Sequence, residues 1–149
     1  MKILITGAKG FVGKNLSASL PEHELYRHDV DSDLSLLDYY CRDADFVFHL
    51  AGVNRPKDPK EFMEGNFGFT SVLLETLKKH GNTCPVTLSS STQAALDNPY
   101  GQSKAPVRIY YEPIALKQGQ RSLFTVSPIC LANGAVQTII VQLLHSATI

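Results

Sequence analysis

A glycine-rich stretch at residues 1–13 (MKILITGAKGFVG) most constrains what this chain can fold into. Its apolar residues at 3–5 are typical of a short buried strand, and glycines follow directly with the spacing G-x-x-G-x-x-G. Gly7 allows a tight turn, and Gly10 lets the backbone approach a pyrophosphate. Gly13 lets the next helix pack close to the sheet, so that its first amides point at phosphate. We interpret this stretch as a dinucleotide-binding loop.

Predicted strands and helices alternate along the chain after this loop. The pattern predicts helices at 14–20, 33–40 and 61–80, and strands at 24–28, 45–52 and 83–88. Such alternation is typical of an α/β fold of the Rossmann type, a doubly wound parallel sheet with helices on both faces.

The end of the second predicted strand is where such folds contact the adenosine ribose of the cofactor. Arg27 would suit a 2′-phosphate and hence NADP, whereas Asp29 or Asp31 would suit a free 2′-hydroxyl and hence NAD. The sequence leaves the choice between NAD and NADP open.

The third predicted strand is almost continuously apolar, as expected of a central parallel strand. It ends in Leu50, Ala51 and Gly52, where the two small residues leave room for a ribose beside the glycine loop. His49 precedes them, and we interpret it as a packed strand residue rather than a catalytic one.

The amino-acid composition limits which classes of partner this chain is expected to bind. The 14 Lys and Arg residues balance 14 Asp and Glu residues, so no charge excess favours nucleic acid or an anionic membrane. The cysteines (Cys41, Cys84 and Cys130) follow no metal-ligand spacing, and their odd number suits a reducing cytosol. No signal peptide and no apolar run long enough to span a bilayer is present. We therefore expect a cytoplasmic protein without a metal site.

Tyr100 and Lys104 stand four residues apart in a segment that Asn98 and Pro99 start as a helix. A phenol ordinarily titrates near pH ~10, and a neighbouring ammonium lowers its pKa toward the range useful for proton transfer. Ser91, at the preceding strand end, can hydrogen-bond the same substrate oxygen. This group predicts a catalytic site.

The motifs TGAKGFVG, HLAG, LSSS and YGQSK, in this order, resemble the extended short-chain dehydrogenase/reductase family, or NAD-dependent epimerase/dehydratase family. HLAGVNRP and LSSSTQAALDNPYGQSK resemble its branch that reduces UDP-4-keto sugars for bacterial capsular polysaccharide. The resemblance implies NAD or NADP as cofactor, a UDP-sugar substrate, and a homodimer as one option for full-length relatives.

The resemblance also implies a role for each matching residue. Tyr100 would donate the proton, Lys104 would tune it and hold the nicotinamide ribose, and Ser91 would orient the keto group. The cofactor would be lined by Gly7, Gly10, Phe11, Val12, Gly13, Leu50, Ala51 and Gly52.

The resemblance covers residues 1–104, and residues 105–149 form an atypical tail. Pro106 interrupts the Tyr–Lys helix, which the family continues for several turns. We expect a truncated Rossmann domain without the family's substrate lobe or this branch's C-terminal cupin domain. Two functions stay open: a nucleotide-sugar oxidoreductase, or an inactive fragment that binds the cofactor.

We predict that residues 105–149 are the family's own coding sequence read in a shifted frame. When the last base of each codon is joined to the first two of the next, residues 127–134 can encode Pro-Asn-Leu-Phe-Gly-Lys-Trp. Residues 123–126 can encode Ile-Tyr-Arg in the same frame, and the family carries both segments at about this distance after its Tyr-x-x-x-Lys. Sequencing the gene tests this, because a shifted frame that does not spell these segments contradicts it.

Overall fold

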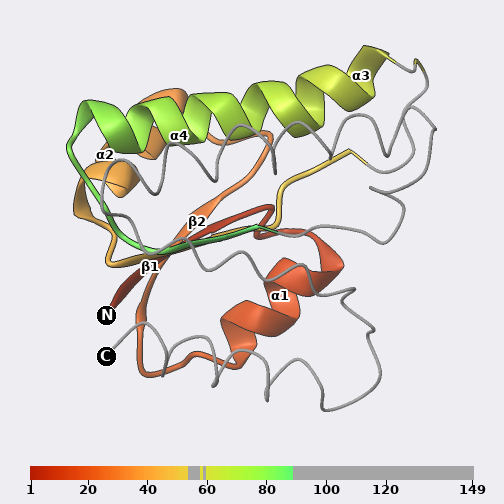
Figure 1. The fold of residues 1–149 in the computed structure, drawn as a ribbon. Coiled ribbons are helices and arrows are strands. Elements are labelled where there is room, and N and C mark those ends of the chain that lie inside the picture. The colour runs from red at the N-terminus through yellow and green to blue at the C-terminus, as the bar shows by residue number, and fades with distance from the viewer. Residues whose placement is uncertain (54–57, 59, 89–149) are drawn as a thin grey trace.

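The structure is a computed structural model that describes residues 1–53, 58 and 60–88. Within them, a parallel sheet contains four strands in the order β2-β1-β3-β4 (Figure 1). The strands are β1 (Lys2–Thr6), β2 (Glu24–His28), β3 (Phe46–His49) and β4 (Val86–Leu88). Helices connect consecutive strands, as parallel pairing requires.

Helices cover both faces of this sheet. Their bounds are α1 (Phe11–Ala18), α2 (Leu34–Asp43), α3 (Lys60–Phe62), the π-helix η1 (Met63–Gly68) and α4 (Phe69–Lys79). Figure 1 shows α2 and α4 on one face of the sheet and α1 on the other. This arrangement confirms the expected Rossmann-type, doubly wound α/β fold.

Alternating side chains of β1 divide the core into two layers. Leu4 points toward α2 and α4, where it packs with Leu37, Leu73 and other buried residues. Ile3 and Ile5 lie on the opposite face of β1 and pack in the cluster that contains Leu16 of α1. All these side chains are at most 2% exposed, so the short strand is buried on both faces.

The observed elements differ from the sequence prediction mainly at their ends. The first helix begins earlier, at Phe11, because Gly10 takes the N-cap position. Strand β4 begins only at Val86, because Pro85 has no amide hydrogen for the ladder, although its carbonyl still accepts from Val47 N at 2.9 Å. The helix predicted over 61–80 is interrupted by a π-helix around its two glycines.

Gly81 ends α4 in the left-handed conformation, with a φ of 62°. The amide of Asn82 then bonds the carbonyl of Leu77 at 3.0 Å. The Asn82 side chain donates to the carbonyl oxygens of Cys41 and Ala44, at 2.7 and 2.9 Å, and accepts from the Cys84 amide at 2.9 Å. One side chain therefore joins the end of α2 to the chain that enters β4.

None of the helices in the described residues is long and apolar enough to cross a membrane.

Replacing Asn82 with alanine is expected to lower the free energy of unfolding by about 2 kcal/mol, because three backbone groups lose their partner together. Urea unfolding monitored by circular dichroism measures this. The control is Asn15→Ala, since Asn15 donates one bond from an exposed position and its loss should cost less than about 0.5 kcal/mol. Equal costs in the two variants would contradict the assigned role of Asn82.

Candidate functional site

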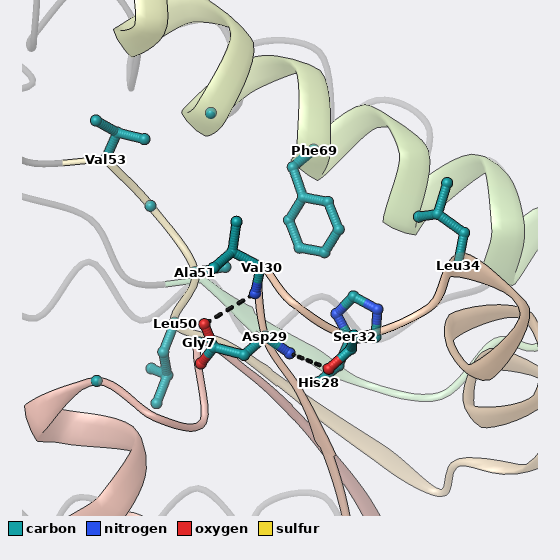
Figure 2. A pocket seen from close by; sticks show the side chains of 13 residues that line it. Gly7, His28, Asp29, Val30, Ser32, Leu34, Leu50, Ala51, Val53 and Phe69 are labelled. Atoms are coloured by element: carbon teal, nitrogen blue, oxygen red, sulfur yellow. Dashed lines mark hydrogen bonds between the residues drawn. The ribbon is translucent and has the colours of Figure 1, made fainter. Parts of the chain in front are cut away.

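A cavity of about 600 Å³ lies at the carboxyl ends of β1, β2 and β3 (Figure 2). Its lining comes from the glycine loop, from parts of 28–34, from 50–53, and from Gly65 and Phe69 on the helical side. The strand order reverses here, because β2 and β3 pair with opposite sides of β1. Ligands of open α/β sheets bind at such a reversal, so the cavity is the candidate site.

The glycines of the loop stand where a side chain would collide with backbone. Gly7 has a φ of 69°, and a Cβ there would lie 2.7 Å from the Ala51 nitrogen. A Cβ on Gly13 would lie 2.4 Å from the Gly7 carbonyl oxygen, and one on Gly10 would lie 3.2 Å from it. Backbone therefore packs directly on backbone, which leaves the surface beside the loop open for a ligand.

Helix α1 begins at the cavity without a side-chain cap. Gly10 is its N-cap, no cap hydrogen bond from a side chain is formed, and the first turn carries no acidic residue. The first amides of an α-helix, here those of Phe11 and Val12, have no partner within the helix, and the dipole makes this end positive. An uncapped helix start beside an open backbone surface fits the pyrophosphate of a dinucleotide.

Asp29 lies just after β2, and its carboxylate faces the glycine loop. Oδ2 accepts from the Lys9 amide at 2.6 Å, and Oδ1 accepts from the Val30 amide at 2.9 Å. The Asp29 amide donates to Ser32 Oγ at 2.9 Å, and Figure 2 shows both local bonds. A carboxylate oxygen has more than one lone pair, so this fixed group can still accept from ribose hydroxyls.

Two basic residues, Lys9 and Arg27, lie close to Asp29 in the structure or the sequence, and neither lines the cavity. The exposed Lys9 ammonium pairs with Asp31, which lowers the pKa of that carboxyl and raises the pKa of the amine. Arg27 is exposed within β2, and strand alternation directs it to the face opposite Tyr26 and His28. Arg27 is therefore not part of the cavity lining, whereas Asp29 is.

A chain of hydrogen bonds supports the loop that follows β3. Thr6 Oγ1 lies 2.6 Å from His49 Nδ1, and His49 Nε2 lies 2.8 Å from Thr70 Oγ1. Thr70 Oγ1 donates to the Asn66 carbonyl oxygen at 2.5 Å, so it accepts from His49, which places the imidazole proton on Nε2. Nδ1 then accepts from Thr6, whose oxygen accepts in turn from the Ala51 amide at 3.3 Å.

The π-helix adds a second support for this loop. The Asn66 side chain accepts from the Val53 amide at 2.9 Å and donates to the Val53 carbonyl at 3.1 Å. His49 is 3% exposed and bonded at both nitrogens, so it is a packed strand residue, as the sequence indicated. The bond from Ala51 to Thr6 and the bonds between Asn66 and Val53 hold the small residues at 51 and 52 at the rim of the cavity.

The structure brings together part of the predicted site. The predicted residues that line the cavity are Gly7, Gly10, Asp29, Leu50, Ala51 and Gly52. Phe11, Val12 and Gly13 lie in the first turn of α1, beside the lining. Ser91, Tyr100 and Lys104 lie outside the described residues, as does the whole of 105–149.

Sequence reasoning missed the residues that reach the cavity from β2 and from the helices. His28, Val30, Leu34 and Phe69 all line it. One signal was present for His28, because alternation in β2 directs it to the same face as Tyr26. Within residues 1–53, 58 and 60–88, no group of three His, Cys, Asp or Glu side chains could hold a metal ion.

Comparison with known proteins gives several matches. A sequence model described as the NAD dependent epimerase/dehydratase family matches residues 3–115. The UDP-2-acetamido-2,6-beta-L-arabino-hexul-4-ose reductase of Pseudomonas aeruginosa is 47% identical over 107 residues, which are 70% of this chain and 29% of that protein. The chain thus spans less than a third of this curated relative.

Solved structures agree with these matches. CapF, a capsular polysaccharide assembling protein of Staphylococcus aureus, is similar with 34% identity and a TM-score of 0.71, over 100% of this chain and 43% of CapF. UDP-glucose 4-epimerase of Bifidobacterium longum, solved with NAD+ and UDP, matches at 19% identity and a TM-score of 0.65, over 78% of this chain and 50% of that one. The latter likeness shows the fold alone.

These findings confirm the family resemblance read from the sequence and the expectation of a nicotinamide dinucleotide, since the matched family is NAD-dependent. The cavity fits such a cofactor at three points: the crowded glycine loop, the uncapped start of α1, and the Asp29 carboxylate.

Gly7→Ala is expected to destabilise the chain and to abolish measurable NAD binding, because the new methyl group would collide with the Ala51 backbone. The matched control is Gly81→Ala. Gly81 also has a positive φ but nothing within 4 Å of its Cβ position, so only the left-handed cost of about 1–2 kcal/mol applies. Urea unfolding and calorimetric titration with NAD measure both effects. Equal destabilisation and retained NAD binding in both variants would contradict the assigned packing.

Proposed function

Because this chain belongs to the NAD dependent epimerase/dehydratase family, we propose that it binds NAD in this cavity as part of a reductase of UDP-4-keto sugars. The product of such a reductase would serve the biosynthesis of capsular polysaccharide. The observation that carries the proposal is the cavity itself, where the glycine loop, the start of α1 and Asp29 converge.

Two relatives support the substrate class. The Pseudomonas aeruginosa relative, 47% identical to this chain, is a reductase whose substrate is a UDP-linked hexul-4-ose, a 4-keto sugar. The structurally similar CapF is a capsular polysaccharide assembling protein. Both likenesses cover less than half of the relative, so the sugar and the pathway are proposals for this chain.

The proposed binding mode uses residues of three segments. The amides of Phe11 and Val12 would hold the pyrophosphate, since they begin an uncapped helix. The Asp29 carboxylate would accept from the adenosine ribose, and Ala51 and Gly52 would leave room for the second ribose. When bound, the reduced nicotinamide supplies the hydride that the sugar carbonyl carbon accepts.

The proton chemistry is assigned to residues outside the described part of the chain. Tyr100 would protonate the carbonyl oxygen, and Lys104 would lower the pKa of that phenol. Ser91 would hydrogen-bond the same oxygen and so orient the substrate. These three roles rest on the sequence motifs and on the family.

The position of Asp29 favours NAD over NADP. A carboxylate fixed at the ribose end would repel a 2′-phosphate, whereas it accepts well from a free 2′-hydroxyl. Arg27, the residue that would instead bind the 2′-phosphate of NADP, lies on the other face of β2. The structure therefore supports the NAD alternative that the sequence left open.

Calorimetric titration of the chain with NAD and NADP tests the cofactor assignment. We expect NAD to bind about tenfold more tightly or better, because NADP would bring its phosphate against Asp29. Asp29→Asn should reduce this preference, since the amide keeps the size of the side chain but removes its charge. Arg27→Gln is the matched control and should leave the preference unchanged. Tighter binding of NADP by the unaltered chain would contradict the assignment.

A hydride-transfer assay tests the activity separately, with reduced cofactor and a UDP-4-keto sugar. Oxidation of the cofactor that depends on the sugar supports the reductase. Cofactor binding without oxidation selects the alternative, a cofactor-binding fragment that does not turn over.

A further inference from the structure

His28 is a buried histidine at the cavity whose ring nitrogens form no hydrogen bond of normal geometry in the described part of the chain. It is the last residue of β2, is 3% exposed and belongs to the cavity lining. Neither Nδ1 nor Nε2 has a hydrogen-bond partner there. Native proteins rarely leave buried polar atoms unpaired, so two unpaired nitrogens beside a ligand cavity require an explanation.

His49 shows what a structural histidine looks like in the same place. Thr6 is in register with His28 on one side and with His49 on the other, so the three form one row across the sheet. Both imidazole rings lie 5.7 Å from the Phe69 ring, measured between centroids. His49 is bonded at both nitrogens, to Thr6 and Thr70, whereas His28 is bonded at neither. Position in the fold therefore does not explain the unpaired ring.

The walls around His28 are apolar and suit a flat base. Its ring stacks on Phe69 with an angle of 13° between the planes. Val30 is 98% exposed and Leu34 is 64% exposed, although both are apolar and line the cavity. Figure 2 shows these side chains around the same space, with His28 below Phe69. Apolar surface left exposed at a cavity mouth is typical of a ligand site.

The neighbouring residue indicates which end of the cofactor reaches this space. Asp29 follows His28 directly and is the proposed partner of the adenosine ribose. The base on that ribose is adenine, so it lies nearer to His28 than the nicotinamide does. Burial lowers the pKa of His28 against the opposing effects of the Asp33 backbone and the Asp29 charge. Near neutral pH the ring is therefore uncharged, with one N–H donor and one acceptor nitrogen.

We propose that His28 recognises the adenine base of the bound dinucleotide, an inference that rests on the proposed cofactor site. The edge of adenine presents an amino donor, and the acceptor nitrogen of a neutral imidazole can accept from it while the other ring nitrogen points away from the base. Phe69 stacks on the ring and forms no polar bond with it, so the ring is free to turn a nitrogen toward the base. His28 is thus a residue that determines the specificity of the site for adenine.

The test compares NAD with nicotinamide hypoxanthine dinucleotide, whose base carries a carbonyl in place of the amino group. We expect the unaltered chain to bind NAD about tenfold more tightly by calorimetry, the value of about one hydrogen bond. In His28→Leu the two affinities should become equal, because NAD loses its extra bond. The melting temperature of His28→Leu without ligand should not fall, since the variant removes two unpaired buried nitrogens.

His49→Leu is the matched control on the same row. Its melting temperature should fall, because its nitrogens have partners, and its preference for NAD should persist. Equal affinities of the unaltered chain for the two dinucleotides would overturn the role of His28 without any variant, and so would a preference that survives in His28→Leu. A chain that binds neither dinucleotide would overturn the proposed cofactor site as well.

Discussion

The approach of the Gly7 backbone to the Ala51 backbone is the constraint on which the rest of the candidate cofactor site depends. A Cβ at position 7 would lie 2.7 Å from the Ala51 nitrogen, so the ends of β1 and β3 meet without any side chain between them. Gly13 extends this packing into α1, whose first turn lies beside the cavity lining because the helix packs directly against the loop. The helix dipole, the loop and the sheet edge are therefore brought to one place by missing side chains.

A layer of oriented hydrogen bonds beneath this loop supplies rigidity where glycine cannot. These hydrogen bonds all run in one direction. The Ala51 amide donates to Thr6, and Thr6 donates to His49. His49 then donates to Thr70, and Thr70 donates to the Asn66 carbonyl. Each hydroxyl of this chain uses both its donor and its acceptor, so reversing one bond would leave another unpaired. The flexible glycine loop is thus held by a chain of hydrogen bonds whose donors and acceptors fit together in one way only.

Much of this fold and part of the site follow from sequence pattern. The apolar run before Gly7 and the alternation of elements predicted the sheet, and Asp29 was among the predicted ribose contacts. Our proposal of Asp29 rather than Arg27 required the structure, because it depends on which side chain lines the cavity at the end of β2. The π-helix was also beyond prediction, since it accompanies a contact between Asn66 and Val53 that only the folded chain creates.

The strand order has a consequence for how such a protein can change over evolutionary time. The hollow exists because the connections from β1 and β3 leave on opposite sides of the sheet, which is a property of the path of the chain. Strand ends, turns and helix residues supply its lining, and Phe69 and Leu50 connect that lining to the two apolar layers of the core. Mutations at exposed lining residues such as Val30 and Leu34 can therefore change the ligand surface without opening the core. Diversification of ligand preference and conservation of the scaffold become separate problems for selection.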